Sequence, residues 1–168
     1  MLVRKVCMIG DFGVGKTSLV QRYVHSVFSD RYLTTVGVKI STREQTLVDG
    51  GRLKLVLWDI AGSGVLTSVE EKYLRGAAAY LLVADGTRRP TLDSAQALDA
   101  RAQELLGPVP RVLTINKRDL SGDWEIGDTE LAAQDSPARP LLLCSARTGE
   151  NVETAFARLA QMLAEHQT

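Results

Sequence analysis

Cysteine and histidine are scarce in this chain of 168 residues, which contains two of each. Cys7 and Cys144 both lie in apolar runs, where a reduced cysteine behaves as a small buried side chain, so we expect no disulfide. Neither cysteine has another cysteine or a histidine at the spacing of a zinc site. Any bound metal ion is therefore expected to be held by oxygen atoms.

The sequence also lacks net charge and long apolar runs. Lysine plus arginine number 20, as do aspartate plus glutamate, so we expect no general attraction to a nucleic acid polymer. No apolar run approaches the roughly 20 residues that cross a bilayer, and the run at residues 6–9 is too short for a signal peptide. The last five residues contain no cysteine for lipidation. We therefore expect a cytoplasmic protein and find no support for a direct lipid anchor in this sequence, which leaves open either a lipidated tail beyond residue 168 or a soluble relative.

The remaining composition is that of one folded domain. Hydrophobic residues make up 45% and charged residues 24%, close to the averages of globular proteins. No repeat or linker divides residues 1–168, so we expect a single domain with its own core. Residues 121–140 suggest a looser connection around one short helix near residues 128–134.

Short apolar runs alternate with helical patterns along the chain. Apolar residues recur at helical spacing in residues 91–106 and 151–165. Pro90 suits the first turn of the former helix, and Asn151 suits the N-cap of the latter. Near-continuous apolar runs, typical of strands buried on both faces, occur at residues 6–9, 53–58, 80–84, 109–115 and 141–144.

One predicted strand differs from the others. Residues 36–48 alternate more in polarity, and Asp49, Gly50 and Gly51 separate them from the next run, which predicts an antiparallel hairpin at a sheet edge. Strands that otherwise alternate with helices pair in parallel. We therefore expect a three-layer α/β fold with a mostly parallel six-stranded sheet, one antiparallel edge strand and helices on both faces. Ligands of such sheets bind beyond the carboxyl ends of the strands.

The most specific motif follows the first predicted strand. Residues 10–17 read Gly, Asp, Phe, Gly, Val, Gly, Lys and Thr, a full match to the phosphate-binding loop between a strand and a helix. The glycines let successive N–H groups face phosphate oxygens, Lys16 adds positive charge, and Thr17 offers a hydroxyl to a hard cation. The motif predicts a nucleoside triphosphate with magnesium. Alone, it leaves open ATP or GTP, and a kinase or a hydrolase.

A second motif follows the predicted strand at residues 109–115. Residues 116–119 read Asn, Lys, Arg and Asp, and the Asp119 carboxylate can accept both N–H donors on one edge of guanine. Adenine presents an acceptor there. In isolation the tetrapeptide is typical of a capped turn, but after a phosphate loop it indicates guanine.

Two further strand ends add to this pattern. Asp59 can hold magnesium through water, and the N–H of Gly62 can approach a terminal phosphate because no side chain intervenes. Residues 144–147 end the last predicted strand, where a small residue lets the backbone touch a base.

With these motifs in this order, the chain resembles the Ras superfamily of small GTPases over essentially its whole length. Residues 34–38, 58–59 and 73–76 are similar to the switch sequences of the Rab branch, and a prokaryotic Rab-like member is one identity that this resemblance leaves open. The resemblance implies a monomeric, P-loop-containing switch that binds GTP or GDP with Mg²⁺ and hydrolyses GTP. Switch I would span about residues 28–38 and switch II about residues 60–76. Effectors, GTPase-activating proteins (GAPs) and exchange factors (GEFs) would bind through these segments.

The resemblance also implies roles for individual residues. Phe28 would stack on guanine, although its residue type also fits a core aromatic, and the neighbouring Thr34 leaves the register of Thr35 open. The catalytic residues would be Lys16, Thr35, Gly62 and Ser63, and the metal ligands Thr17, Thr35 and Asp59. The nucleotide would be bound by Asp11, Phe12, Gly13, Val14, Gly15, Lys16, Thr17, Ser18, Phe28, Thr35, Gly62, Asn116, Lys117, Asp119, Ser145, Ala146 and Arg147.

Two positions depart from the family pattern. Ser63 stands where family members usually carry the glutamine that orients the attacking water, and Phe12 places a bulky ring in the phosphate loop. We expect slow unaided hydrolysis, which a partner could raise by supplying a group in trans. The alternative is a nucleotide-dependent interaction module with little or no hydrolysis. A phosphotransferase would need a lid, and the chain has no insertion of that size.

Overall fold

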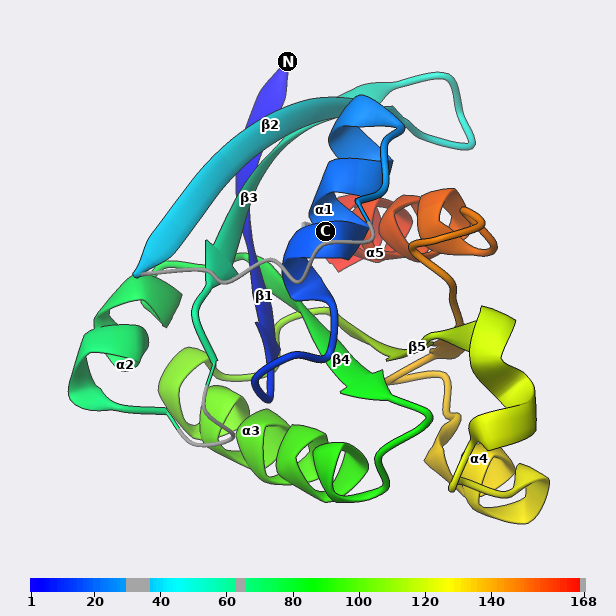
Figure 1. Ribbon diagram of the computed structural model, residues 1–168. Coiled ribbons are helices and arrows are strands. Elements are labelled where there is room, and N and C mark those ends of the chain that lie inside the picture. The colour runs from blue at the N-terminus through cyan, green and yellow to red at the C-terminus, as the bar shows by residue number, and fades with distance from the viewer. Residues whose placement is uncertain (30–36, 63–65, 167–168) are drawn as a thin grey trace.

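The computed structural model describes residues 1–29, 37–62 and 66–166. Six strands form one sheet in the order β2-β3-β1-β4-β5-β6, and β1 to β5 are labelled in Figure 1. β2 pairs with β3 in antiparallel fashion, and the other neighbours are parallel, which confirms the predicted fold. The strands are β1 (Leu2–Gly10), β2 (Val38–Thr46), β3 (Arg52–Ile60), β4 (Ala79–Asp85), β5 (Arg111–Asn116) and β6 (Leu141–Leu143).

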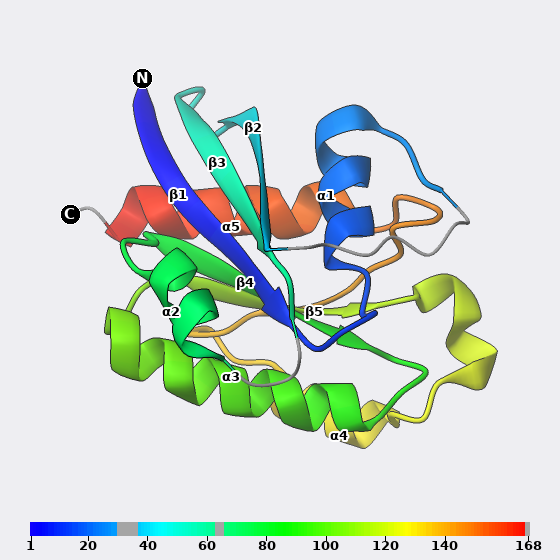
Figure 2. The ribbon, with the colours of Figure 1, turned by 60° about the vertical axis from the view of Figure 1, so that its left-hand side comes forward.

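Helices cover both faces of the sheet. Apolar side chains of α1 and α5 pack on one face, and those of α2, α3 and α4 pack on the other; α5 and α3 lie on opposite sides of the sheet (Figure 2). A 3₁₀ helix, η1, follows β5. The bounds are α1 (Lys16–His25), α2 (Ser68–Leu74), α3 (Pro90–Leu106), η1 (Arg118–Asp123), α4 (Asp128–Gln134) and α5 (Val152–His166).

The central strands bury both of their faces because successive side chains alternate across the sheet. In β1, Val6 and Met8 contribute to the cluster beneath α1 and α5, whereas Cys7 and Ile9 contribute to the cluster beneath α3. All seven residues of β4 are buried. This two-sided burial explains why the strand sequences read as continuous apolar runs.

Both cysteines are buried and free. Burial raises the pKa of each thiol to about 12, so neither is a reactive thiolate near neutral pH. Among the described residues, no helix is long and apolar enough to cross a bilayer.

The predicted helix starts are confirmed in position, with one difference in conformation. Pro90 does begin α3, as expected, and Asn151 does precede α5. However, Asn151 has a left-handed φ of 57°, not the extended conformation of a capping residue, and its side-chain amide donates to the Leu143 carbonyl at 2.8 Å. It therefore joins the helix to the end of β6.

Candidate functional site

The phosphate-binding loop connects the end of β1 to the start of α1, and its glycines are required by close contacts. Gly15 has φ 100°, and a Cβ there would lie 2.2 Å from Nδ2 of Asn116. A Cβ on Gly10 would lie 2.4 Å from the carbonyl oxygen of Val83 in β4. Both positions exclude any larger residue, so the loop is packed directly against β4 and the end of β5.

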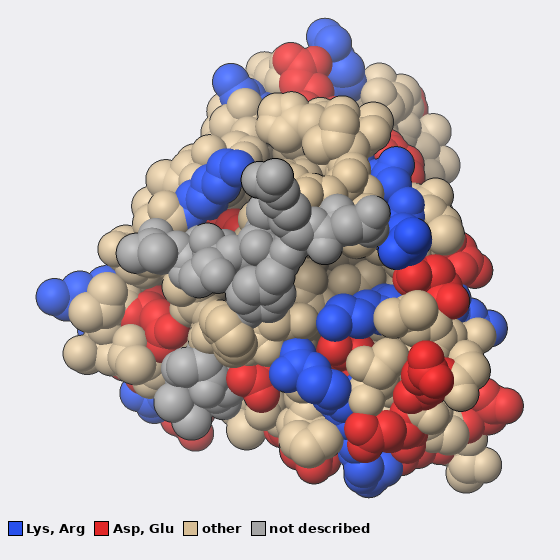
Figure 3. All heavy atoms as spheres, viewed as in Figure 1, with Lys and Arg blue, Asp and Glu red and all other residues tan. Residues whose placement is uncertain are grey.

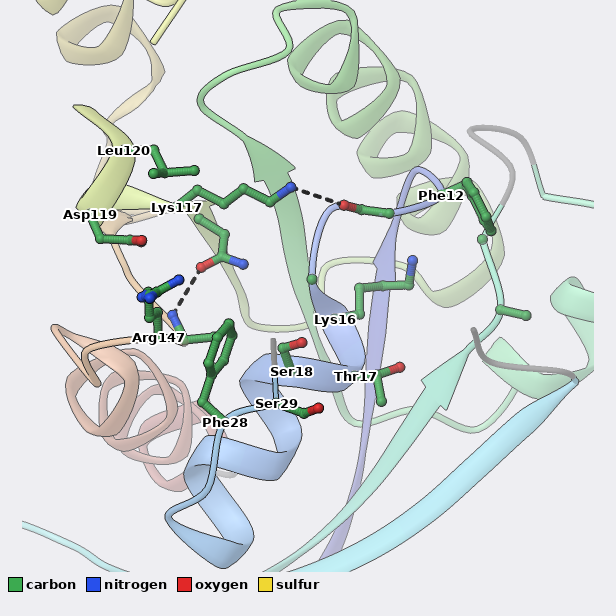
Figure 4. Close-up of a pocket in the computed structure, with 16 residues that line it drawn as sticks. Phe12, Lys16, Thr17, Ser18, Phe28, Ser29, Lys117, Asp119, Leu120 and Arg147 are labelled. Atoms are coloured by element: carbon green, nitrogen blue, oxygen red, sulfur yellow. Dashed lines mark hydrogen bonds between the residues drawn. The ribbon is translucent and has the colours of Figure 1, made fainter. Parts of the chain in front are cut away.

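A cavity of about 250 Å³ opens beside this loop. Figure 4 shows two ends: Phe12, Lys16 and Thr17 lie toward one, and Phe28, Asp119 and Arg147 lie toward the other. The lining combines most of the predicted nucleotide-binding residues with three others: Phe12, Gly13, Gly15, Lys16, Thr17, Ser18, Phe28, Ser29, Ala61, Gly62, Asn116, Lys117, Asp119, Leu120, Ala146 and Arg147.

Ser29, Ala61 and Leu120 are lining residues that the sequence interpretation missed. Each is a direct neighbour in the chain of a residue that was predicted, namely Phe28, Gly62 or Asp119. Adjacency was the only signal that could have identified them, because a serine, an alanine and a leucine have no distinctive chemistry here.

Four predicted residues support the lining without belonging to it. Asp11 accepts hydrogen bonds from the Phe12 N–H and the Ser94 hydroxyl. The carbonyl of buried Val14 accepts from Asn116. Ser145 and Asp59, both buried, contact Asp119 and Thr17 respectively.

Lys16 brings a buried ammonium to one end of the cavity. Its Nζ donates to the carbonyl oxygens of Gly10 at 2.9 Å and Asp11 at 3.1 Å. Burial lowers the pKa of Lys16, and the nearby charges of Asp59, Asp11 and Glu70 oppose that shift. This cation faces a loop rich in N–H groups, an arrangement suited to phosphate.

Gly62 brings the end of β3 against the same loop. A Cβ at this position would lie 2.0 Å from the Gly10 carbonyl oxygen and 2.7 Å from Lys16 Nζ. Only glycine therefore lets its backbone approach the phosphate end so closely.

Thr17 and Asp59 form an oxygen pair suited to a hard cation. The Thr17 hydroxyl donates to Asp59 Oδ2 at 2.5 Å, and hydroxyl and carboxylate oxygens are the donors that Mg²⁺ prefers. The described residues contain no cluster of three histidine, cysteine, aspartate or glutamate side chains able to hold a metal. A magnesium site here would thus fit the usual case, in which phosphate and water oxygens complete the coordination.

Asn116 connects the two ends of the cavity. Its Nδ2 donates to the Val14 carbonyl at 3.0 Å, and its Oδ1 accepts from the Ala146 N–H at 3.2 Å. One side chain thereby joins the phosphate loop, the end of β5 and the loop after β6. Asp119 lies at the mouth, where Oδ1 accepts from the Ser145 hydroxyl at 2.8 Å.

A buried carboxylate braces this region from beneath. Asp85 has a fully buried side chain and forms ion pairs with Lys117 at 2.7 Å and Arg88 at 3.1 Å. Burial alone would raise the pKa of Asp85, but hydrogen bonds from Lys117 and Thr87, and the charge of Lys117, bring it below its usual value. Arg88 also donates to the Phe12 carbonyl at 2.9 Å. The phosphate loop is therefore tied to the end of β4.

Two aromatic side chains lie at opposite ends of the cavity. Phe28 is at the base end, with the Arg147 guanidinium 5.9 Å from its ring centroid. Phe12 is at the phosphate end and is 54% exposed (Figure 4).

On the face of the molecule shown in Figure 3, lysine and arginine side chains intermingle with acidic side chains.

Two predicted functional residues, Thr35 and Ser63, lie outside the described residues, as does Thr34. The geometry above therefore concerns the phosphate loop, the base end and the strand end at Asp59.

Comparison with known proteins gives a consistent result. The sequence model of the Ras family matches residues 5–165. The chain is similar to human Ras-related protein Rab-4B, with 37% identity over 162 residues that cover 95% of this chain and 75% of that protein. It is also similar to human Rab-37, with 38% identity over 166 residues, 96% of this chain and 74% of the relative. It is similar as well to Ras-related protein RABC2a of Arabidopsis thaliana, with 36% identity over 165 residues that cover 96% of this chain and 78% of that protein.

Proposed function

This chain belongs to the Ras family of GTP-binding switch GTPases, in the Rab branch, and from that premise we propose that it binds GTP and GDP with Mg²⁺ and hydrolyses GTP slowly. The observation that carries the proposal is one cavity lined by both Lys16 and Asp119. It offers a cation for phosphates at one end and a carboxylate for a base at the other.

The base end selects guanine by matching its donors. Asp119 accepts the ring N–H and the exocyclic amine, while Ser145 holds the carboxylate in place from the other side. Adenine would set an acceptor against that carboxylate. A site built to hydrogen-bond a donor strongly rejects an analogue that lacks that donor. Phe28 and Arg147 flank the base, and both side chains line the cavity.

The phosphate end holds charge with backbone N–H groups and one ammonium. The N-terminus of α1 faces the phosphates, Lys16 approaches the outer ones, and the Gly62 N–H contacts the terminal one. Magnesium held by Thr17 and Asp59, with Thr35 as a further ligand, would neutralise charge on the outer phosphates. Loss of the terminal phosphate removes contacts from switch I and switch II, which makes their order depend on the nucleotide.

Slow hydrolysis follows from two residues. Serine at position 63 is shorter than the glutamine that orients water in family members, so its contribution to positioning is reduced. The exposed ring of Phe12 stands at the phosphate end, where it limits the space for a water-orienting group. We expect the unaided rate to be below that of Ras itself, about 3–5 × 10⁻⁴ per second.

A single-turnover assay of phosphate release tests this proposal. Ser63→Gln and Phe12→Gly should each raise the rate, and the double variant should raise it most. Ser136→Gln provides a matched control, because Ser136 is an exposed serine after α4, outside both switch segments and the cavity lining, and its replacement should leave the rate unchanged. A wild-type rate well above the Ras value would contradict the proposal.

The alternative function is a nucleotide-dependent interaction module that barely hydrolyses GTP, and the exposed Phe12 ring favours it. Comparing GTP loss with and without cell extract separates the two. Acceleration by extract indicates a GTPase whose missing group a GAP supplies in trans, whereas an unchanged, near-zero rate supports the module. In both cases effectors would bind the switch segments. If the protein is a GTPase, GEFs would also replace the GDP left by hydrolysis with GTP.

A further inference from the structure

Trp124 lies between the residue that follows β4 and the loop that follows β5. This half-buried residue directly follows η1, and its ring lies against Gly86, the residue after β4. A Cβ on Gly86 would lie 2.1 Å from Cε2 and 2.3 Å from Cδ2 of the indole. Gly86 does not have a left-handed φ, so the contact with the ring, rather than backbone conformation, requires glycine at this position.

The polar atom of the same ring bonds the base-reading loop. Nε1 of Trp124 donates to the Lys117 carbonyl oxygen at 2.8 Å. Two backbone hydrogen bonds reinforce the junction: Glu125 N–H to the Gly86 carbonyl at 2.9 Å, and Gly86 N–H to the Asn116 carbonyl at 3.1 Å. The indole therefore fastens the end of β5 to the end of β4.

This fastening acts on a loop with an unusual backbone. Lys117 has φ 72°, a conformation that residues with a side chain rarely adopt. Its carbonyl accepts from the Leu120 N–H at 2.9 Å as well as from Trp124. The direction of that carbonyl fixes the turn from Lys117 to Leu120, and Asp119 lies within the turn.

We infer that Trp124 is a positioning residue for guanine recognition: its indole N–H holds the Lys117 peptide so that Asp119 meets both donors of the base. The inference rests on the proposed function. A ring that only filled space would stabilise the fold without affecting how well the site distinguishes one purine from another. Base discrimination is therefore the property that separates the two roles.

Inosine triphosphate (ITP) is the probe for this discrimination, because inosine lacks the exocyclic amine of guanosine. A correctly aligned Asp119 gains one extra charge-assisted hydrogen bond from GTP, which favours GTP over ITP by about 10-fold or more. Misalignment weakens that bond selectively, so GTP binding should fall more than ITP binding.

The experiment compares Trp124→Phe with Trp58→Phe in the full chain. The first variant keeps an aromatic ring against Gly86 but removes the N–H donor. The second changes the other tryptophan of the chain, which lies in β3 and contacts Lys5 and Tyr73. Competition binding gives the affinities for GTP and ITP, and stopped-flow measurements give the rate of GDP release.

For Trp124→Phe we expect about a 10-fold loss of GTP affinity, faster GDP release and a GTP-to-ITP ratio that shrinks toward one. Trp58→Phe should keep the wild-type ratio. Gly86→Ala provides an independent test, because its Cβ displaces the indole and should shrink the ratio in the same way.

Two results would overturn the inference. If Trp124→Phe and Gly86→Ala keep the wild-type ratio, whether or not overall affinity falls, then Trp124 is only a packing residue while the proposed function stands. If the wild-type protein itself does not prefer GTP to ITP, then the guanine-reading role of Asp119 fails as well. The two failures are thus distinguishable.

Discussion

Replacing Asp119 by asparagine should change which purine the cavity accepts. In the structure, Oδ1 of Asp119 accepts from the Ser145 hydroxyl at 2.8 Å, an interaction that the asparagine oxygen can keep. The other carboxylate oxygen becomes an amide NH₂, which sets a donor against a guanine donor. Two charge-assisted hydrogen bonds of about 1.5–3 kcal/mol each are at stake. We therefore expect GTP affinity to fall by about 10²- to 10⁴-fold.

Xanthine nucleotides provide the positive outcome of this experiment. Xanthine carries a carbonyl where guanine carries its amine, so Asp119→Asn should bind XTP more tightly than the wild type does. Competition against a fluorescent nucleotide measures both affinities. Asp123→Asn is the matched control, because Asp123 is an exposed acid of η1 outside the cavity lining. Unchanged GTP affinity in Asp119→Asn would refute the assignment of this residue.

Three further perturbations test other parts of the site. Gly15→Ala forces a Cβ to 2.2 Å from Asn116 Nδ2 at a left-handed φ and should lower the unfolding free energy by about 1–3 kcal/mol; denaturant titration yielding wild-type stability would contradict the packing argument. Asp85 has a lowered folded-state pKa, so its stabilisation is present above the ordinary pKa of 3.8 and is lost as pH falls through the lower value. Asp85→Asn should therefore lower the unfolding free energy by about 1–2 kcal/mol at pH 7. It should also weaken the fall of the unfolding free energy at acid pH, whereas an unchanged pH dependence would exclude Asp85 as a stabilising group. Finally, switch I and switch II should exchange amide hydrogens more slowly with a nonhydrolysable GTP analogue than with GDP, and equal protection would remove the basis for a switch.

The strands and the phosphate loop were predictable because their physical requirements are local. A strand buried on both faces needs a continuous apolar run, and β4 provides one in which every residue is buried. The turn at Asp49 to Gly51 likewise predicted the antiparallel pairing of β2 with β3.

The start of α2 also has a local sequence signal. Thr67 and Glu70 form a capping box at the start of α2, and a threonine followed three residues later by glutamate predicts such a start. Asn151, expected as the N-cap of α5, is a less specific signal. Its residue type suits several turn conformations, and the fold uses its amide to bond Leu143.

The long-range supports of the site were beyond local patterns. The Asp85 carboxylate at the end of β4 pairs with Lys117, which follows β5. Trp124 packs against Gly86, which lies 38 positions earlier in the chain. Neither pairing has a sequence signature, because each depends on which strand ends the sheet order brings side by side. The chemistry at the cavity was therefore predictable, whereas the contacts that hold it in place required the structure.

The identity of the nucleotide bound to the purified protein tests the central claim most directly. Denaturing the protein and separating the released compounds by ion-exchange chromatography, followed by equilibrium titration with GTP and ATP, gives that identity and the preference. We predict guanosine di- or triphosphate in the released fraction and GTP binding that exceeds ATP binding by about 10⁴-fold or more. Release of adenosine nucleotides, or equal affinity for ATP and GTP, would contradict the account.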